Sequence, residues 1–252
     1  MYKKEIMAEL IRAEASQLGI DLIGFSIMKP EYCYREDWKE YIVKKNYNYV
    51  ISLASAISVS SCDLLLKGID QGSMFYFDKH TKAQAAYLDQ ASEKLCVFLE
   101  KYGYMAFHVP GMDTAFPKEW PKTIISHITH ARLSGLGIMG DSGMILTKEY
   151  GPRVRLTSIL TDCPLPVPET LPENFCTHCE MCKKICPSGS IKGASFDSSK
   201  PAEYYNDKVV CNAHRDENKA NYGTRFCNLC MAVCPIGEDK KRIKDNKGSI
   251  ER

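Results

Sequence analysis

Apolar positions in the first third of the chain change from helical to strand spacing. Over residues 3–18 they recur every three or four positions, as on one face of a helix, and Gly19 follows where a helix commonly ends. Residues 20–25 alternate, and residues 49–54 form a short apolar run, so both have the length and pattern of strands. The pattern predicts an amphipathic helix followed by two strands.

The middle of the chain continues this mixture of periods. The spacing predicts helices over residues 80–102 and 121–134, and strands over residues 104–109 and 154–161. Strands and helices mixed in this way are typical of a layered structure. We therefore expect an α/β (α+β) core.

Cysteines divide the chain unevenly. Eight of the twelve lie between positions 176 and 234, and a proline-rich stretch over residues 163–172 precedes them. Because proline can continue neither a helix nor a central strand, this stretch is typical of a linker. We predict two domains, residues 1–169 and residues 170–252. The other four cysteines have no close cysteine neighbour and are expected to be small buried apolar residues: Cys33, Cys62, Cys96 and Cys163.

Composition narrows the possible functions. Hydrophobic residues make up 44% and charged residues 25%, as in an ordinary globular protein. No apolar run has the roughly 18 residues of a membrane span, and the chain does not open on a signal peptide, so we expect a cytoplasmic protein without membrane contact. The net charge of +2 gives no reason to expect a nucleic-acid partner. Because the cytosol is reducing, twelve cysteines indicate metal rather than disulfides.

The cysteine spacing is specific. Residues 176–187 read C-x₂-C-x₂-C-x₃-C-P, the run of bacterial two-cluster ferredoxins, in which the fourth cysteine serves the other cluster. Residues 227–235 repeat this run without its first cysteine, and Cys211 is the obvious substitute. This predicts two [4Fe–4S] clusters with four thiolates each. One is expected to take Cys176, Cys179, Cys182 and Cys234, and the other Cys186, Cys211, Cys227 and Cys230.

An alternative for these cysteines is a pair of structural zinc sites, because paired C-x₂-C motifs also hold tetrahedral zinc. Zinc sites have no use for three cysteines spaced evenly by two residues, nor for a fourth followed by proline in both runs. Iron is therefore favoured over zinc. His178 lies inside the first run and could tune a cluster, although we expect an ordinary solvated loop residue.

Three glycines form a second motif. Gly135, Gly137 and Gly140 match G-x-G-x-x-G, but a dinucleotide site needs this pattern after a strand and before a helix. Here a predicted helix precedes the glycines, which argues against such a site. The glycines instead let the backbone turn and approach something closely, either a cofactor or another strand.

The glycine motif and its neighbours carry a family resemblance. Residues 131–140, 146–155 and 160–162, followed by the two cysteine runs, resemble the cobalamin-dependent reductive dehalogenases and epoxyqueuosine reductases. The resemblance is clear over residues 110–238 and fainter toward the N-terminus. It implies a nitroreductase-like core that holds cobalamin near Gly135, Gly137 and Gly140, with a C-terminal domain like a bacterial two-cluster ferredoxin.

The resemblance also implies roles and partners. An electron donor of ferredoxin or flavodoxin type would reduce the clusters, and the core would act on a small-molecule substrate. Asp113 loosely matches the proton-donating aspartate of epoxyqueuosine reductases, although Phe116 interrupts the motif. Because the chain ends soon after the second run and lacks the helical repeat domain associated with tRNA, we do not expect a tRNA substrate.

Two further functions stay open at this point. A core of this type resembles a scaffold that elsewhere binds flavin, which would give a corrinoid-free reductase. Alternatively, the chain is an electron-transfer or activating protein that feeds another enzyme. A buried pocket near the glycines would favour an enzyme, because a carrier needs clusters near its surface and no such pocket.

Overall fold

The computed structural model describes residues 3–111, 123–197 and 204–250. The chain divides into two compact units: residues 1–55, 84–136 and 155–172 form the first, and residues 56–83, 137–154 and 173–252 form the second. The predicted boundary at residue 170 lies close to residue 173, where the chain passes from the first unit to the second for the last time. The prediction did not anticipate that two earlier segments join the cysteine-rich part. Residues 1–169 and 170–252 as separate domains stay a prediction.

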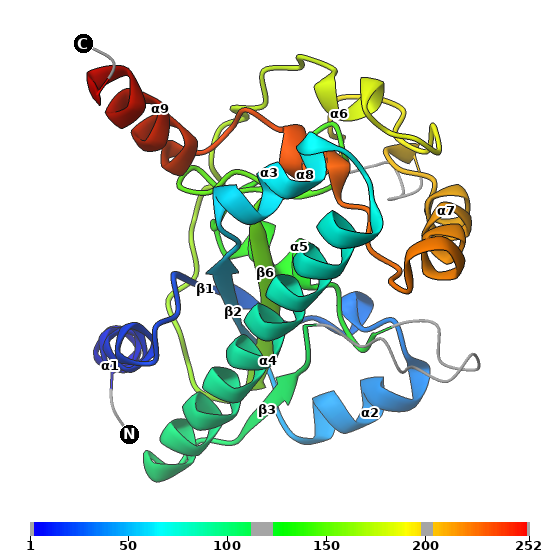
Figure 1. The fold of residues 1–252 in the computed structure, drawn as a ribbon. Helices are drawn as coiled ribbons and strands as arrows, with labels where there is room; N and C mark the ends of the chain where they lie inside the picture. Colours follow the sequence, from blue (N-terminus) through cyan, green and yellow to red (C-terminus); the bar gives the residue numbers. More distant parts are fainter. Residues whose placement is uncertain (1–2, 112–122, 198–203, 251–252) are drawn as a thin grey trace. The chain divides into compact units, whose positions relative to one another are not determined.

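A four-stranded sheet forms the centre of the first unit (Figure 1). Its outer pairs are antiparallel, with Leu22 opposite Ala54 and Ala106 opposite Thr161. In spatial order the strands are β1 (Leu22–Ile27), β2 (Tyr49–Ala56), β6 (Val154–Thr161) and β3 (Ala106–Val109).

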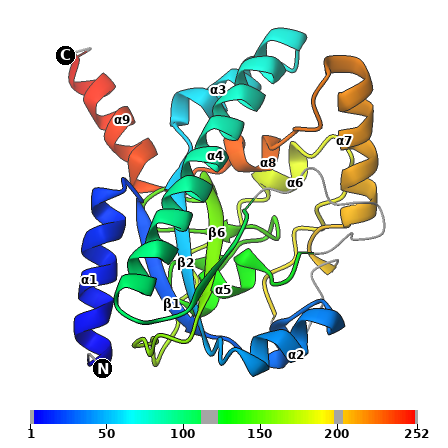
Figure 2. The same ribbon diagram turned by 90° about the horizontal axis from the view of Figure 1, so that it is seen from below.

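Helices cover both faces of this sheet (Figure 2). Ile51 and Leu53 pack into one cluster with α1 (Lys4–Gln17) and the second half of α4 (Gln71–Lys101). Val50, which points the other way, packs with α2 (Glu36–Lys44). Burial on both faces explains why β2 reads as an apolar run rather than an alternating strand. The expected mixed α/β fold class is confirmed.

Helix α4 is longer than its predicted span of 80–102, since it begins at Gln71. The cause is local: the Asp70 carboxylate accepts from the backbone N–H of Ser73 at 2.7 Å, and the Ser73 hydroxyl accepts from the N–H of Asp70 at 3.1 Å. This reciprocal cap stabilises a start that the apolar stripe does not reveal. Although α4 has 31 residues, no helix in the described segments is apolar enough over sufficient length to cross a membrane.

Helix α5 (His127–Leu133) is shorter than the predicted span of 121–134. The Ser126 hydroxyl accepts from the N–H of Thr129 at 3.1 Å and so begins the helix at residue 127. Ile125 is buried as expected, but it lies in a short bridge with Cys33 rather than in a helix. The first described residues of the predicted helix are therefore extended.

The second unit is built from short elements. Its helices α3 (Val59–Lys67) and α6 (Met181–Lys184) both pack against α8 (Leu229–Val233). A small hairpin joins β4 (Ile138–Met139) to β5 (Ile145–Leu146). The remaining helices are α7 (Lys208–Tyr222) and α9 (Glu238–Ile250).

Candidate iron–sulfur site

The two cysteine runs fold alike. Glu180 and Asn228 occupy the same place, one residue after the first cysteine of a C-x₂-C pair, and have φ values of 58° and 54°. Each left-handed residue is followed at once by a short helix, α6 or α8. The turn brings the second cysteine of the pair back toward the first. The repeat in sequence is thus a repeat in structure.

One group of thiols lines a small cavity in the second unit. Its opposite wall is the turn of the β4–β5 hairpin at Gly140, Asp141 and Ser142. Cys230 touches the same cavity. The four cysteines expected to share a cluster all line it: Cys176, Cys179, Cys182 and Cys234.

The other four cysteines are electrostatic neighbours of one another. Burial raises the pKa of the Cys230 thiol to about 12, and Cys227, Cys186 and Cys211 act in the same direction. Burial also raises the pKa of Cys227, again with contributions from Cys211 and Cys186. In contrast, the cysteines that raise the pKa of Cys234 are Cys179 and Cys176. Cys230 also borders the first cavity, but the cysteines that act on its pKa are those of the second expected group; its membership of that group stays a prediction.

Cys186 has an environment of its own. Burial opposes its ionisation, but hydrogen bonds from the hydroxyls of Ser188 and Ser190 and from the N–H groups of Ser190 and Ile191 lower its pKa to about 7. Both hydroxyl oxygens lie 3.4 Å from the Cys186 sulfur. Donors arranged around a sulfur in this way stabilise a thiolate, the form in which cysteine binds metal.

These features fit an iron–sulfur site. All twelve cysteines are free, so the eight thiols are not used in disulfides. Burial raises the pKa of several of them, which makes them poor free thiolates until a cation compensates the charge and displaces the proton. Soft thiolate donors in two groups of four suit iron–sulfur clusters. The four remaining cysteines are buried, as expected for small apolar residues.

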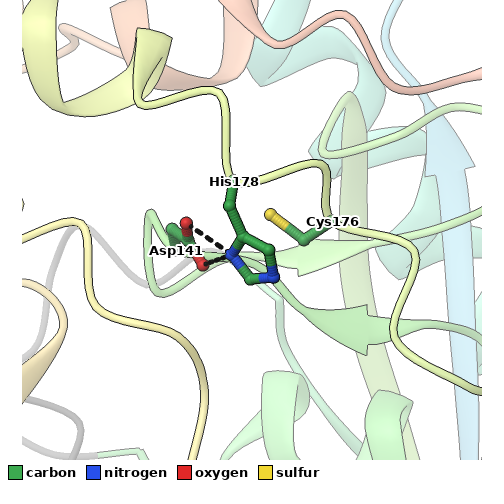
Figure 3. A group of neighbouring side chains, drawn as sticks. All are labelled: Asp141, Cys176 and His178. Atoms are coloured by element: carbon green, nitrogen blue, oxygen red, sulfur yellow. Dashed lines mark hydrogen bonds and ion pairs between the residues drawn. The ribbon is translucent and has the colours of Figure 1, made fainter.

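Asp141, Cys176 and His178 lie together (Figure 3), and the first two line the cavity. The Nδ1 atom of His178 is 2.9 Å from one Asp141 oxygen and 3.0 Å from the other. The Asp141 side chain is 4% exposed, whereas that of His178 is 46% exposed. His178 is therefore more than a solvated loop residue, because it holds the first cysteine run against the hairpin turn.

Arg153 braces the segment that follows Cys234. Its guanidinium is fully buried and donates to both oxygens of Asp239 and to the backbone carbonyls of Cys234 and Ile236. Gly151 lies close to the same segment, since a Cβ there would stand 2.1 Å from the Ile236 carbonyl oxygen. One buried cation thus positions the backbone on which a candidate cluster ligand is carried.

The glycine motif approaches a strand. A Cβ at Gly137 would lie 2.1 Å from the Leu146 carbonyl oxygen, and one at Gly140 would lie 2.6 Å from the Leu146 side chain. Gly135 has a φ of 76° and follows α5, which suits a sharp turn off a helix. Of the two expectations for these glycines, packing against a strand is observed. Cofactor binding by Gly135, Gly137 and Gly140 stays a prediction.

The sequence analysis did not identify some residues of the site, and one residue that it did identify lies outside the described segments. Asp113, the expected proton donor, is outside the described residues. Asp141 was missed, although a short turn between two glycines is a place where a polar side chain can be presented. Arg153 was seen as part of the family resemblance, but its partner Asp239 lies 86 residues away and has no local signal.

The cysteine segment matches a known protein family. Residues 175–237 match the family described as "4Fe-4S double cluster binding domain". This match spans both cysteine runs and Cys211, and it favours iron over zinc. The chain therefore carries a double [4Fe–4S] cluster domain, as the spacing predicted.

Similarity to known enzymes extends over most of the chain. A tetrachloroethene reductive dehalogenase from Sulfurospirillum multivorans is 30% identical over 166 residues, which cover 60% of this chain and 29% of the relative. An epoxyqueuosine reductase from Bacillus anthracis is 24% identical over 250 residues, covering 92% of this chain and 64% of the relative. The chain is a relative of these two enzyme families. It spans less than two thirds of the length of either relative.

Solved structures of both enzyme families share the fold of this chain. The catabolic reductive dehalogenase NpRdhA superposes with a TM-score of 0.70 at 17% identity, covering 94% of this chain and 33% of that one. An epoxyqueuosine reductase solved with a modified tRNA stem loop gives 0.59 at 17% identity, covering 95% and 66%. The family and fold expectations are confirmed. The expectation of no nucleic-acid partner stays a prediction, since one of these enzymes was crystallised with RNA.

Proposed function

We propose that this chain is an iron–sulfur oxidoreductase in which two [4Fe–4S] clusters relay electrons toward reduction of a small substrate. The supporting observation is that the four cysteines predicted for one cluster line a common cavity, while the other four neighbour one another, which agrees with the grouping that the spacing predicts. In both groups the fourth thiol comes from a distant part of the sequence, as expected when two cysteine runs exchange ligands.

The residues of the second unit would act as holders of the clusters. Bound clusters would supply one-electron transfer, with electrons from an external donor of ferredoxin or flavodoxin type. The left-handed turns at Glu180 and Asn228 would orient the thiols, and Arg153 would fix the backbone beyond Cys234. The Asp141 and His178 pair would close the cavity edge beside Cys176.

Whether the chain also binds cobalamin, which the resemblance implies, is a separate question from whether it binds the clusters. A Cβ at Gly137 or Gly140 would meet Leu146 of β5, and cofactor binding by these glycines stays a prediction. The proposed relay requires only the clusters. A corrinoid, a flavin or the predicted proton donor Asp113 would each add to it in the core.

A second candidate is an electron carrier for another enzyme. The observation in its favour is that Cys179 is exposed, whereas the other seven candidate ligands are partly buried. A thiol at the surface puts the cluster it binds within reach of a partner protein. The two candidates share their clusters and differ in whether this chain turns over a substrate.

The clusters are tested first, by anaerobic purification with iron and zinc analysis and electron paramagnetic resonance (EPR) spectra. Two clusters of four irons require eight irons per chain. We expect Cys230→Ser to lose the signal of one cluster and Cys62→Ser, which alters a buried cysteine outside both groups, to keep both. Zinc in place of iron, or equal loss in both variants, would refute the proposal.

Turnover is tested next with the cluster-loaded protein and a low-potential reductant. Tetrachloroethene and an epoxyqueuosine-modified tRNA stem loop are the probes suggested by the relatives, each with and without added cobalamin or flavin. Turnover of either probe supports the oxidoreductase and identifies its second cofactor. Reduced clusters that pass electrons to a partner but turn over neither probe would favour the carrier.

A further inference from the structure

Two cations meet at the carbonyl of Cys234. The Nη1 atom of Arg153 lies 3.3 Å from this carbonyl oxygen, and the Nζ atom of Lys240 lies 3.2 Å from it. Lys240 also donates to the carbonyl of Ala232 at 2.7 Å. The backbone that carries one candidate cluster ligand is thus contacted by two positive side chains.

The charges of these two cations are balanced differently. Asp239 accepts two hydrogen bonds from Arg153 and forms an ion pair with it. Among the described residues, both hydrogen bonds donated by the Lys240 ammonium go to carbonyls, and no carboxylate lies within ion-pair distance of it. The Lys240 ammonium therefore has no direct carboxylate partner in the described part of the chain, and Asp63 acts on it only from beyond ion-pair distance.

The position of Lys240 is costly without such an anion. Burial lowers the pKa of its ammonium, and the nearby Arg153 acts in the same direction, whereas Asp63, Cys62 and Cys234 partly oppose this shift. It also lies in the first turn of α9, where the helix dipole disfavours a cation. An anion bound through Cys234 would compensate both effects.

We infer that Lys240 is a positioning residue that raises the reduction potential of the cluster held by Cys176, Cys179, Cys182 and Cys234. This inference rests on the proposed function, because it requires that cluster to be present. A cluster with four thiolate ligands is anionic and gains another negative charge when it accepts one electron from the external donor. No bond forms or breaks in this step. A nearby cation stabilises the reduced form more than the oxidised form.

Lys241 provides a matched control. It is the next residue of the same helix and carries the same charge, but its side chain is exposed to solvent. Water and salt screen an exposed charge much more strongly than a half-buried one. Variants of these two lysines therefore change the net charge equally and differ in which cation is removed.

The test is an EPR-monitored redox titration of the anaerobic, cluster-loaded protein. Lys240→Met removes the charge and keeps the apolar stem, Lys240→Gln is a second uncharged variant, and Lys240→Arg keeps the charge. At a fixed potential we expect Lys240→Met to lower the ratio of reduced to oxidised cluster about tenfold, equivalent to about 59 mV for one electron. If the EPR signal that shifts in Lys240→Met is absent from Cys179→Ser, that signal belongs to the cluster expected to bind Cys179.

The remaining variants decide whether the charge is the cause. Lys240→Arg should restore most of the potential, Lys241→Gln should change either cluster by less than about twofold, and the second cluster should not move. No shift in Lys240→Met, or an equal shift in Lys241→Gln, would overturn the inference. Loss of clusters in both uncharged variants would make Lys240 a structural residue and would overturn it as well.

Failure of the inference is distinguishable from failure of the proposed function. A wild-type protein that holds no iron clusters refutes the function. A wild-type protein with both clusters and an unmoved potential in Lys240→Met refutes only the role of the lysine.

Discussion

We expect Arg153→Met to lower the stability of the second unit more than any other single substitution of a charged residue in that unit. The side chain is fully buried, and its contacts go to Asp239, which is 13% exposed, and to the carbonyls of Cys234 and Ile236. Methionine fills a similar volume but offers no donor. The substitution leaves a largely buried carboxylate without its cation and the Ile236 carbonyl without this donor, whereas the Cys234 carbonyl keeps its contact with Lys240.

The expected cost follows from these contacts. Removing one partner of a buried ion pair costs about 3–5 kcal/mol, because the remaining charge stays buried and unpaired. The two carbonyls add to this cost only in part, since such contributions within one network are not additive. We therefore expect about 4 kcal/mol. Asp239→Asn in the same chain removes the orphaned charge and should recover about 1–3 kcal/mol.

The assay is the rate at which cluster absorbance bleaches in urea under anaerobic conditions. Loss of clusters makes unfolding irreversible, so a rate is the appropriate measure. If the Arg153 contacts break before the rate-limiting step, 4 kcal/mol raises the rate by about a thousandfold. Arg242→Met, which alters an exposed residue of α9, is the control and should leave the rate unchanged. A rise below about fivefold, or no recovery by Asp239→Asn, would refute the reasoning.

Three shorter predictions test other parts of the chain. Burial lowers the pKa of His130 to about 4, so the unfolded chain binds more protons below pH 6.5, and the free energy of unfolding should fall by about 2 kcal/mol from pH 7 to pH 5. Urea midpoints at the two pH values measure this; burial also lowers the pKa of His127 to about 4 and adds a fall of its own, so His130→Asn should remove about half of the total. Gly137→Ala should destabilise the hairpin and lower the melting temperature, because its Cβ would collide with the Leu146 carbonyl; a wild-type melting temperature would contradict this contact. His178→Ala leaves the buried Asp141 without its partner, so iron release from the cluster beside it should be faster by about five- to thirtyfold, with the second cluster as internal control.

The sheet of the first unit was predictable because its strands have local signals. Residues 49–54 and 154–161 have the apolar content that a strand needs, and both lie at the centre of the sheet. The start of α4 was not predictable from the apolar stripe, since the cap at Asp70 and Ser73 sets it. In the same way, Ser126 begins α5 six residues later than the periodicity indicates.

The double-cluster domain was predictable for a different reason. A cubane needs closely spaced thiols, so the chemistry itself imposes a short-range pattern on the sequence. The surrounding groups have no such constraint. Asp141 and His178 are 37 residues apart in the sequence, and Arg153 and Asp239 are 86 apart. Nothing in the local sequence distinguishes these residues from other polar residues of the same segments. The groups that adjust the site are therefore visible only in the fold.

The potential of the second cluster should be adjusted by hydrogen bonds to Cys186. The Ser190 hydroxyl is 1% exposed and lies 3.4 Å from the Cys186 sulfur, so water cannot replace it readily when it is removed. A neutral hydrogen bond contributes about 1 kcal/mol, so Ser190→Ala should lower the ratio of reduced to oxidised second cluster roughly fivefold at a fixed potential. Ser188→Ala should do less, because that side chain is partly exposed and solvent can take its place. Since Ser190 and Lys240 act on different clusters, the two substitutions combined should shift each potential as the single variants do. A shift of the first cluster in Ser190→Ala would contradict this division, because it would place Cys186 among the wrong four ligands.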